Sequence, residues 1–195
     1  MLKIFEQQLA VMRLPEENLN LLRDRGRLAL DGWYMEKHMA FGPNDRFEMN
    51  FGSHGIFVGD AHIGGKIDRL AINEKLRTID IVDYKTGKSY SRWQQNILKL
   101  HRYRQQLLTY KLLVERSSRF KNYRVDKATL EFVEPDEDGK IVQLELVTDE
   151  KEMEGHAKLL QGVWQRVMDL DFPEVSKYPP TISGIKAFEE DLLAK

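Results

Sequence analysis

Two stretches of alternating apolar residues, joined by a short polar turn, constrain the fold of this chain more than any other feature. The first is "AHIGGKIDRLAI" (61–72), the second is "LRTIDIVDY" (76–84), and "NEK" (73–75) separates them. A period of two is typical of β-strands, and the polar turn predicts that they pair as a hairpin. The second strand nevertheless ends at Asp83 and Lys85, although an unpaired carboxylate is costly to remove from water.

The rest of the chain supplies further strands and the helices that would cover them. The segment before "FGPND" (41–45) has a helical period, and "RFEMNF" (46–51) alternates like a strand. Downstream, the pattern predicts a helix over 93–117, a second hairpin over 127–147 with "PDEDG" (135–139) as its turn, a long helix over 148–170 capped by Asp149, and a short helix over 183–193. His156 falls on the apolar stripe of the long helix and is expected in the core. This order predicts an α/β domain with a central mixed β-sheet of about five strands flanked by helices.

Composition narrows the class of protein. The 195 residues are 42% hydrophobic and 31% charged, as in an ordinary globular protein, and no repeat or linker divides residues 1–195, so one domain is expected. The absence of cysteine excludes disulfides, zinc–thiolate sites and iron–sulfur clusters. No apolar run reaches the roughly 18 residues of a membrane helix, and no signal peptide is present. We expect a cytoplasmic protein with no membrane partner.

The net charge is −1, but the basic residues are concentrated in one stretch. No Asp or Glu occurs from Tyr84 to Val114, where the basic residues are Lys85, Lys88, Arg92, Lys99, Arg102, Arg104 and Lys111 and the interleaved aromatics are Tyr90, Trp93, Tyr103 and Tyr110. Basic side chains neutralise phosphates and aromatic rings stack on bases, so this stretch predicts a nucleic-acid interface. The alternative is a solvated basic helix with ordinary core aromatics.

The charged residues at the first hairpin suggest a metal site. Asp83 and Lys85 are two positions apart on a strand and therefore project from the same face, and the hairpin would bring Asp68 beside Asp83. Two close carboxylates repel each other, and a hard divalent cation such as Mg²⁺ removes that repulsion. A neighbouring lysine can stabilise charge on a phosphate. The alternative is that Asp68 pairs with Arg69 or Lys66, while Asp83 and Lys85 mark a solvated strand end.

Three segments, "GGKIDRL", "IDIVDYKTGK" and "QLLTYKLL", together resemble the RecB-family branch of the PD-(D/E)XK nucleases. The resemblance is close over about residues 46–115. It implies a restriction-endonuclease-like fold and Mg²⁺-dependent hydrolysis of DNA, with Mn²⁺ as a substitute. It also implies a superfamily 1 (UvrD/Rep-like) helicase module as partner, in cis or in trans, and a role in DNA repair or recombination.

The resemblance also implies roles for individual residues. Asp68 and Asp83 would be metal ligands together with the Tyr84 carbonyl, and Lys85 would be the catalytic lysine. Further residues would support the site or contact DNA: Gln106 and Tyr110, one helical turn apart, then Lys88, Arg92, Lys99 and Arg102, with Glu48 able to approach the metal from the preceding strand. For Gln106 and Tyr110 the alternative is an ordinary helix packing face.

The chain departs from the family pattern in two ways. It lacks the four cysteines that hold an iron–sulfur cluster in many relatives, and none of its histidines (His38, His54, His62, His101 and His156) lies in the early helical turn that contacts the metal in relatives. Residues 1–195 therefore resemble the C-terminal part of a longer helicase–nuclease that would cleave DNA poorly alone. A catalytically weak DNA-binding or helicase-docking module is the alternative function, and a structural protein with a coincidental motif is a third.

Overall fold

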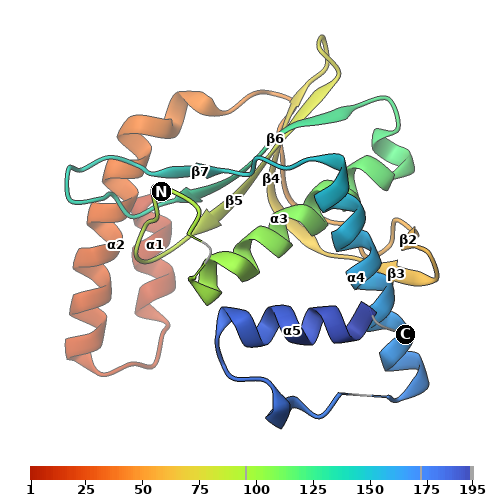
Figure 1. Cartoon of the computed structure of the whole chain (residues 1–195). Helices are drawn as coiled ribbons and strands as arrows, with labels where there is room; N and C mark the ends of the chain where they lie inside the picture. The colour runs from red at the N-terminus through yellow and green to blue at the C-terminus, as the bar shows by residue number, and fades with distance from the viewer. Residues whose placement is uncertain (95, 172, 194–195) are drawn as a thin grey trace.

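A five-stranded mixed sheet forms the centre of the computed structural model, which describes residues 1–94, 96–171 and 173–193 (Figure 1). Its strands lie in the order β1-β4-β5-β6-β7, with bounds β1 (Arg46–Asn50), β4 (Lys66–Asn73), β5 (Thr78–Lys85), β6 (Arg124–Phe132) and β7 (Gln143–Glu145). Only the central pair, β5 with β6, is parallel; the other three pairs are antiparallel. The predicted α/β class and mixed sheet are confirmed.

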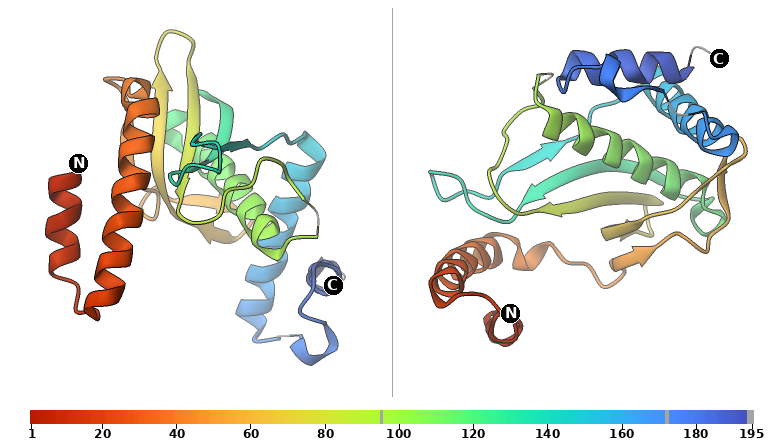
Figure 2. Two further views of the ribbon diagram at one scale, coloured as in Figure 1. Left: turned by 90° about the vertical axis from the view of Figure 1, so that its left-hand side faces the viewer. Right: turned by 90° about the horizontal axis from the view of Figure 1, so that it is seen from below.

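Helices cover both faces of this sheet (Figure 2). On one side lie α1 (Leu2–Ala10) and α2 (Glu16–Lys37); on the other lie α3 (Leu98–Arg116), and beyond it α4 (Glu150–Asp169) and α5 (Ile182–Leu193). Three short 3₁₀ turns, η1 (His38–Ala40), η2 (Ser118–Phe120) and η3 (Val175–Lys177), complete the described elements. Among the described residues, no helix is both long and apolar enough to cross a membrane.

The main core lies between the sheet and α3. Alternate residues of the central strands, such as Leu70 and Ile81, are completely buried with Leu107 and Leu113 of α3. Full burial of such a side chain contributes roughly 1.5–3 kcal/mol, so this layer holds α3 firmly against the central strands β5 and β6. The fixed position of α3 matters because its next face carries the polar residues of the candidate site.

The first predicted strand is broken, and this prediction was wrong. Residues 61–72 do not form one strand, because β2 (Ile56–Val58) and β3 (Ala61–Ile63) make a separate two-stranded sheet before β4 begins. The two sheets are separated at Gly64 and Gly65, where an added Cβ would be in tight contact; at Gly64 it would lie 3.1 Å from the Gly52 Cα. A Cβ at Gly65 would lie 3.0 Å from Leu113 Cδ1.

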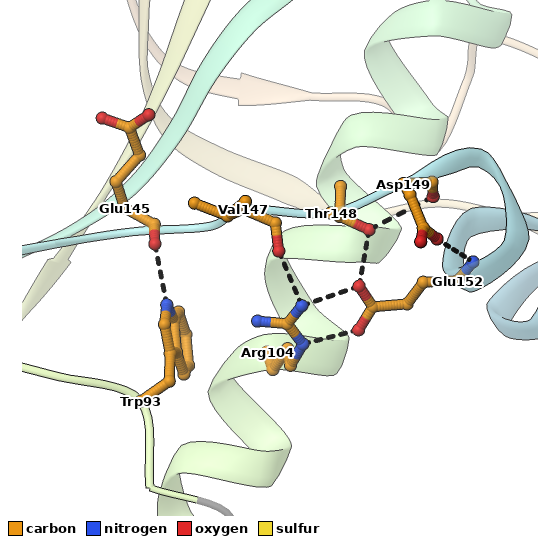
Figure 3. Close-up of polar contacts among 7 residues, drawn as sticks. All are labelled: Trp93, Arg104, Glu145, Val147, Thr148, Asp149 and Glu152. Carbon is orange, nitrogen blue, oxygen red and sulfur yellow. Dashed lines mark hydrogen bonds and ion pairs between the residues drawn. The ribbon is translucent and has the colours of Figure 1, made fainter.

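The helix predicted over 93–117 begins later, at Leu98. The indole N–H of Trp93 donates a 2.7 Å hydrogen bond to the carbonyl of Glu145, the last residue of β7, and the Arg104 guanidinium lies 5.4 Å from the indole ring centroid (Figure 3). These contacts bind the Trp93 side chain to β7 and to Arg104 of α3, so Trp93 lies outside the helix. The prediction failed at this end because it included Trp93 in the helix, whereas the Trp93 indole is bonded to β7.

Other boundaries shift by smaller amounts. The N-terminal region forms two helices, separated around Pro15, and the first hairpin turn covers 74–77 because Asn73 still pairs with Thr78. Several predictions are confirmed. Asp149 caps α4 by accepting a 2.8 Å hydrogen bond from the Glu152 N–H, and the turn of the second hairpin has Gly139 at φ 77°.

Candidate functional site

The first hairpin brings Asp68 and Asp83 together, as its turn and alternation predict. Arg69 pairs with Val82 and Leu70 with Ile81, so the register continues to Asp68 opposite Asp83. The backbone N–H of Tyr84 donates a 2.8 Å hydrogen bond to Asp68 Oδ2. This bond holds the Asp68 carboxylate against the end of β5, next to the strand position that carries Asp83.

Asp83 is an acidic side chain in an apolar setting. Its side chain is 2% exposed, and Oδ2 lies 2.6 Å from Lys85 Nζ. This short contact is an ion pair with the Lys85 ammonium, although its angle lies outside that of a regular hydrogen bond. Burial raises the pKa of Asp83, the adjacent Lys85 opposes this shift, and the charge of Asp68 adds to it. The site therefore contains a buried carboxylate that is paired with one ammonium and lies beside a second carboxylate.

One face of α3 completes the surroundings of Lys85. The Lys85 ammonium donates a 2.8 Å hydrogen bond to Gln106 Oε1, and Gln106 Nε2 donates a 2.8 Å bond to the Tyr110 hydroxyl. Burial raises the pKa of Tyr110 to about 12, and the charge of Asp83 contributes. The hydroxyl thus stays protonated near neutral pH. The predicted helical pair forms a hydrogen-bonded support for the lysine as well as a packing face.

Tyr103 is a neighbour of the site whose position the sequence did not predict. Its ring centroid lies 4.5 Å from Lys85 Nζ and 5.6 Å from Lys99 Nζ. A cation over an aromatic ring is attracted to the ring's negative face. The sequence signal was its spacing, since Tyr103 precedes Gln106 by three residues on α3 and therefore lies on the same helix face.

The arrangement fits a divalent cation bound through few protein ligands. Asp68, Asp83 and the Tyr84 carbonyl would supply hard oxygen ligands, and the burial of the Asp83 carboxylate beside that of Asp68 is the observation that fits this use. Mg²⁺ typically keeps several waters and binds one or two carboxylates plus a substrate phosphate. Within the described ranges, no three His, Cys, Asp or Glu side chains gather as a metal-binding group.

Glu48 is not drawn into the site by its side chain. It lies on β1 between residues paired with Ile67 and Arg69, which places it level with Asp68. Its side chain is 60% exposed and forms an ion pair with Lys66 instead. Glu48 also has a positive φ of 52°, which is uncommon for a residue other than glycine. The Glu48 backbone therefore lies beside Asp68, while the Glu48 carboxylate lies outside the carboxylate pair, against Lys66.

The alternative partners of Asp68 are occupied elsewhere. Arg69 lies on the opposite face of β4, where its Nε donates a 2.8 Å hydrogen bond to Asp45. Lys66 pairs with Glu48. The interpretation in which Asp68 forms an ordinary ion pair with Arg69 or Lys66 is therefore wrong, and Asp68 stays available on the face of Asp83.

The predicted nucleic-acid interface is smaller than the acid-free stretch suggests. Lys88, Arg92 and Arg102 are exposed and Lys99 is half-buried. Arg104 instead forms a two-point contact with Glu152, at 2.5 and 2.6 Å, and donates to the Val147 carbonyl (Figure 3). Lys111 pairs with a glutamate one turn along α3 at 2.5 Å. Arg104 thus links α3 to α4, and Lys111 forms an ion pair within α3.

Three of the four interleaved aromatics also have structural roles. Trp93 bonds to Glu145, Tyr90 packs against Phe132 with 6.0 Å between ring centroids, and Tyr110 is buried. These contacts support the alternative of ordinary core aromatics for Trp93, Tyr90 and Tyr110. They leave Tyr103 as the aromatic of this set that lies beside Lys85.

None of the five histidines contacts the carboxylate pair. Their contacts lie elsewhere: His38 with the Tyr34 carbonyl, His54 with Ser117, His62 with the Phe57 ring, His101 with Glu189, and His156 with Thr109. His156 is buried as expected, and burial lowers its pKa. The histidine that contacts the metal in the resembled family has no counterpart among these side chains.

Comparison with known proteins agrees with this geometry. No curated protein matches the chain. A family model described as the PD-(D/E)XK nuclease superfamily matches residues 2–179, which include the sheet, the carboxylate pair and the helices α1 to α4. The chain belongs to the PD-(D/E)XK nuclease superfamily.

Proposed function

We propose that this chain hydrolyses phosphodiester bonds in DNA with the help of Mg²⁺ or Mn²⁺, and that Asp68, Asp83 and Lys85 form its active site. Membership of a nuclease superfamily supports the reaction class. The observation that carries the residue assignment is the Asp83 carboxylate, which is buried beside that of Asp68 and lies 2.6 Å from the Lys85 ammonium.

In this proposal the two carboxylates and the Tyr84 carbonyl hold the cation, and each is positioned by the hairpin. Bound there, the cation would lower the pKa of a coordinated water and neutralise charge on a phosphate oxygen. The Tyr84 N–H holds Asp68 in one orientation through its 2.8 Å bond. The end of β5 would therefore supply the Tyr84 carbonyl as a ligand, and its Tyr84 N–H orients the Asp68 carboxylate as another.

Lys85 would act on the substrate. Its side chain is 14% exposed and its ammonium is bonded to Gln106, so the ammonium is held in place rather than free in solvent. A preorganised positive charge at this point stabilises the negative charge that develops on the phosphate during hydrolysis. Gln106 is then a positioning residue for Lys85, and Tyr110 positions Gln106.

Exposed basic residues before α3 and in its first turns would bind the DNA backbone. Lys88, Arg92 and Arg102 are exposed, and Lys99 lies over the Tyr103 ring. Side chains of this kind bind phosphates without reading base sequence. We accordingly propose non-sequence-specific DNA as the substrate, within a RecB-like branch that works with a superfamily 1 helicase.

A second candidate function is DNA binding or helicase docking with reduced catalysis. The observation that favours it is the set of histidine contacts, since every histidine is engaged away from Asp68 and Asp83. A metal held by fewer protein groups is less well positioned, and a misplacement near 1 Å can cost about 10²-fold in rate.

One experiment separates the two candidates. Labelled linear DNA is incubated with the protein and Mg²⁺ or Mn²⁺, with Lys85→Ala and a chelator as controls. Cleavage that needs both the metal and Lys85 supports the nuclease. Tight DNA binding without such cleavage supports the binding module. Equal cleavage by Lys85→Ala would contradict the assignment of the active site.

A further inference from the structure

The loop that follows Lys85 is fastened by a glutamate from a different strand. Lys85 is the last residue of β5, and two positions later the Gly87 N–H donates a 2.5 Å hydrogen bond to Glu134 Oε1. Next to this bond, the Val133 N–H donates to the Lys85 carbonyl at 3.0 Å. The backbone on both sides of Thr86 is thus bonded to the residues that follow β6.

Arg25 of α2 holds that glutamate from the other side. Its Nε and Nη2 donate to the two oxygens of Glu134, each at 2.7 Å. These bonds lower the pKa of Glu134, so the carboxylate is ionised at neutral pH. A two-point guanidinium–carboxylate contact fixes direction as well as distance. The position of Glu134 Oε1, which accepts the hydrogen bond from the Gly87 N–H, is therefore fixed. Gly87 itself has a φ of 93°, a backbone conformation that glycine adopts readily.

The contact adds little to the attachment of α2. Arg25 is 54% exposed, and ion pairs this exposed have small effects on stability. Further along α2, the buried Trp33 donates a 2.6 Å bond to Glu131 of β6, and this bond does not involve the loop. Loss of the Arg25–Glu134 contact would leave α2 attached, so its consequence falls on the loop.

We propose that Glu134, oriented by Arg25, is a positioning residue for Lys85. It acts through Gly87: by fixing the turn just after β5 it fixes the backbone from which the Lys85 side chain reaches Gln106 and Asp83. This inference rests on the proposed function for its catalytic consequence. Its structural part, the fastening of Gly87, can be measured without any cleavage assay.

The variants are chosen to separate the glutamate's two contacts. Glu134→Ala removes both. The exchanged pair Arg25→Glu/Glu134→Arg can restore an ion pair, but arginine has no acceptor for the Gly87 N–H. Glu134→Gln keeps a carbonyl oxygen that can accept it. The matched control is Glu6→Ala. It removes the ion pairs that Glu6 of α1 makes with Arg23 and Arg27, which lie on α2 as Arg25 does, and it leaves the loop contacts in place.

Hydrogen exchange of the Gly87 amide and steady-state cleavage of linear DNA are then measured for each protein. We expect Glu134→Ala and the exchanged pair to lose protection at Gly87 and to lower kcat by roughly 10- to 100-fold with KM nearly unchanged, as a displaced catalytic group would. Glu134→Gln should retain most of both properties, and Glu6→Ala should match the wild type in both.

Three results would overturn the inference: unchanged protection of Gly87 in Glu134→Ala, recovery of kcat in the exchanged pair, or an equal loss of kcat in Glu6→Ala. If the wild-type protein cleaves no DNA with either metal, the proposed function fails. The exchange measurement still decides whether Glu134 fastens the loop, so the two failures are distinguishable.

Discussion

Lys85 Nζ and Gln106 Oε1 lie 2.8 Å apart, which joins the end of β5 to the middle of α3. The bond spans 21 positions in sequence and brings a charged group from the sheet to an amide on the covering helix. Gln106 is in turn bonded to the buried Tyr110, so the position of the lysine ammonium depends on two consecutive hydrogen bonds. This relationship leads to the first of four predictions.

Replacing Gln106 by leucine should impair catalysis more than stability. Lys85 would lose its acceptor, and hydrogen bonds to charged groups contribute about 1.5–3 kcal/mol, which corresponds to a loss of roughly 10- to 100-fold in kcat. Gln105→Leu is the control, because Gln105 bonds to Glu189 on the other side of α3. Steady-state cleavage rates measure the effect; equal rates in the two variants would show that Gln106 is only a packing residue.

Asp83→Asn should weaken Mn²⁺ binding while thermal stability holds or rises. Burial raises the pKa of Asp83, which means that its ionised form is disfavoured in the folded protein, and asparagine removes that cost. Asp80→Asn is a matched control on the same strand, since burial also raises the pKa of Asp80, which lies on the opposite face. Calorimetry and melting curves test this. Unchanged Mn²⁺ affinity in Asp83→Asn would remove Asp83 from the metal site.

Reversing Lys88, Arg92 and Arg102 to glutamate should weaken binding to every DNA sequence alike. Each lost phosphate contact should also lower the slope of log affinity against log salt by about 0.9 on duplex DNA. The control reverses Arg119, Lys121 and Arg124, three exposed basic residues near the start of β6, at the other end of the sheet from Lys85. A change in sequence preference, or an equal effect of the control, would contradict the proposed interface.

Stability should fall as pH drops below about 6.5 because of His156. Burial lowers the pKa of His156 in the folded protein. The charges of Glu189 and Glu152 each raise this pKa by less than burial lowers it, and His101 lowers it further. The unfolded chain then binds a proton first, so the folded state loses stability from the ordinary histidine pKa downward. Urea unfolding between pH 5 and 7 measures this. His156→Gln should flatten the dependence, and an unchanged slope would assign it to other groups.

The candidate site could be predicted from the sequence to the extent that it is local. Asp83 and Lys85 share a face because strand positions alternate, and Asp68 joins them because a short turn folds its strand back onto theirs. Gln106 and Tyr110 share a face because they are one helical turn apart. In each case the deciding interaction lies within a few residues or across a single hairpin.

Tertiary structure alone decided the use of the remaining polar residues. Arg104 looked like part of a DNA interface, but it pairs with Glu152, 48 positions away, and Trp93 left the helical pattern to bond with Glu145. The contact of Arg25 with Glu134 spans 109 positions. The helical and strand periods report which face a side chain lies on, but not which distant charge the fold will bring to it. That depends on how the helices pack on the sheet.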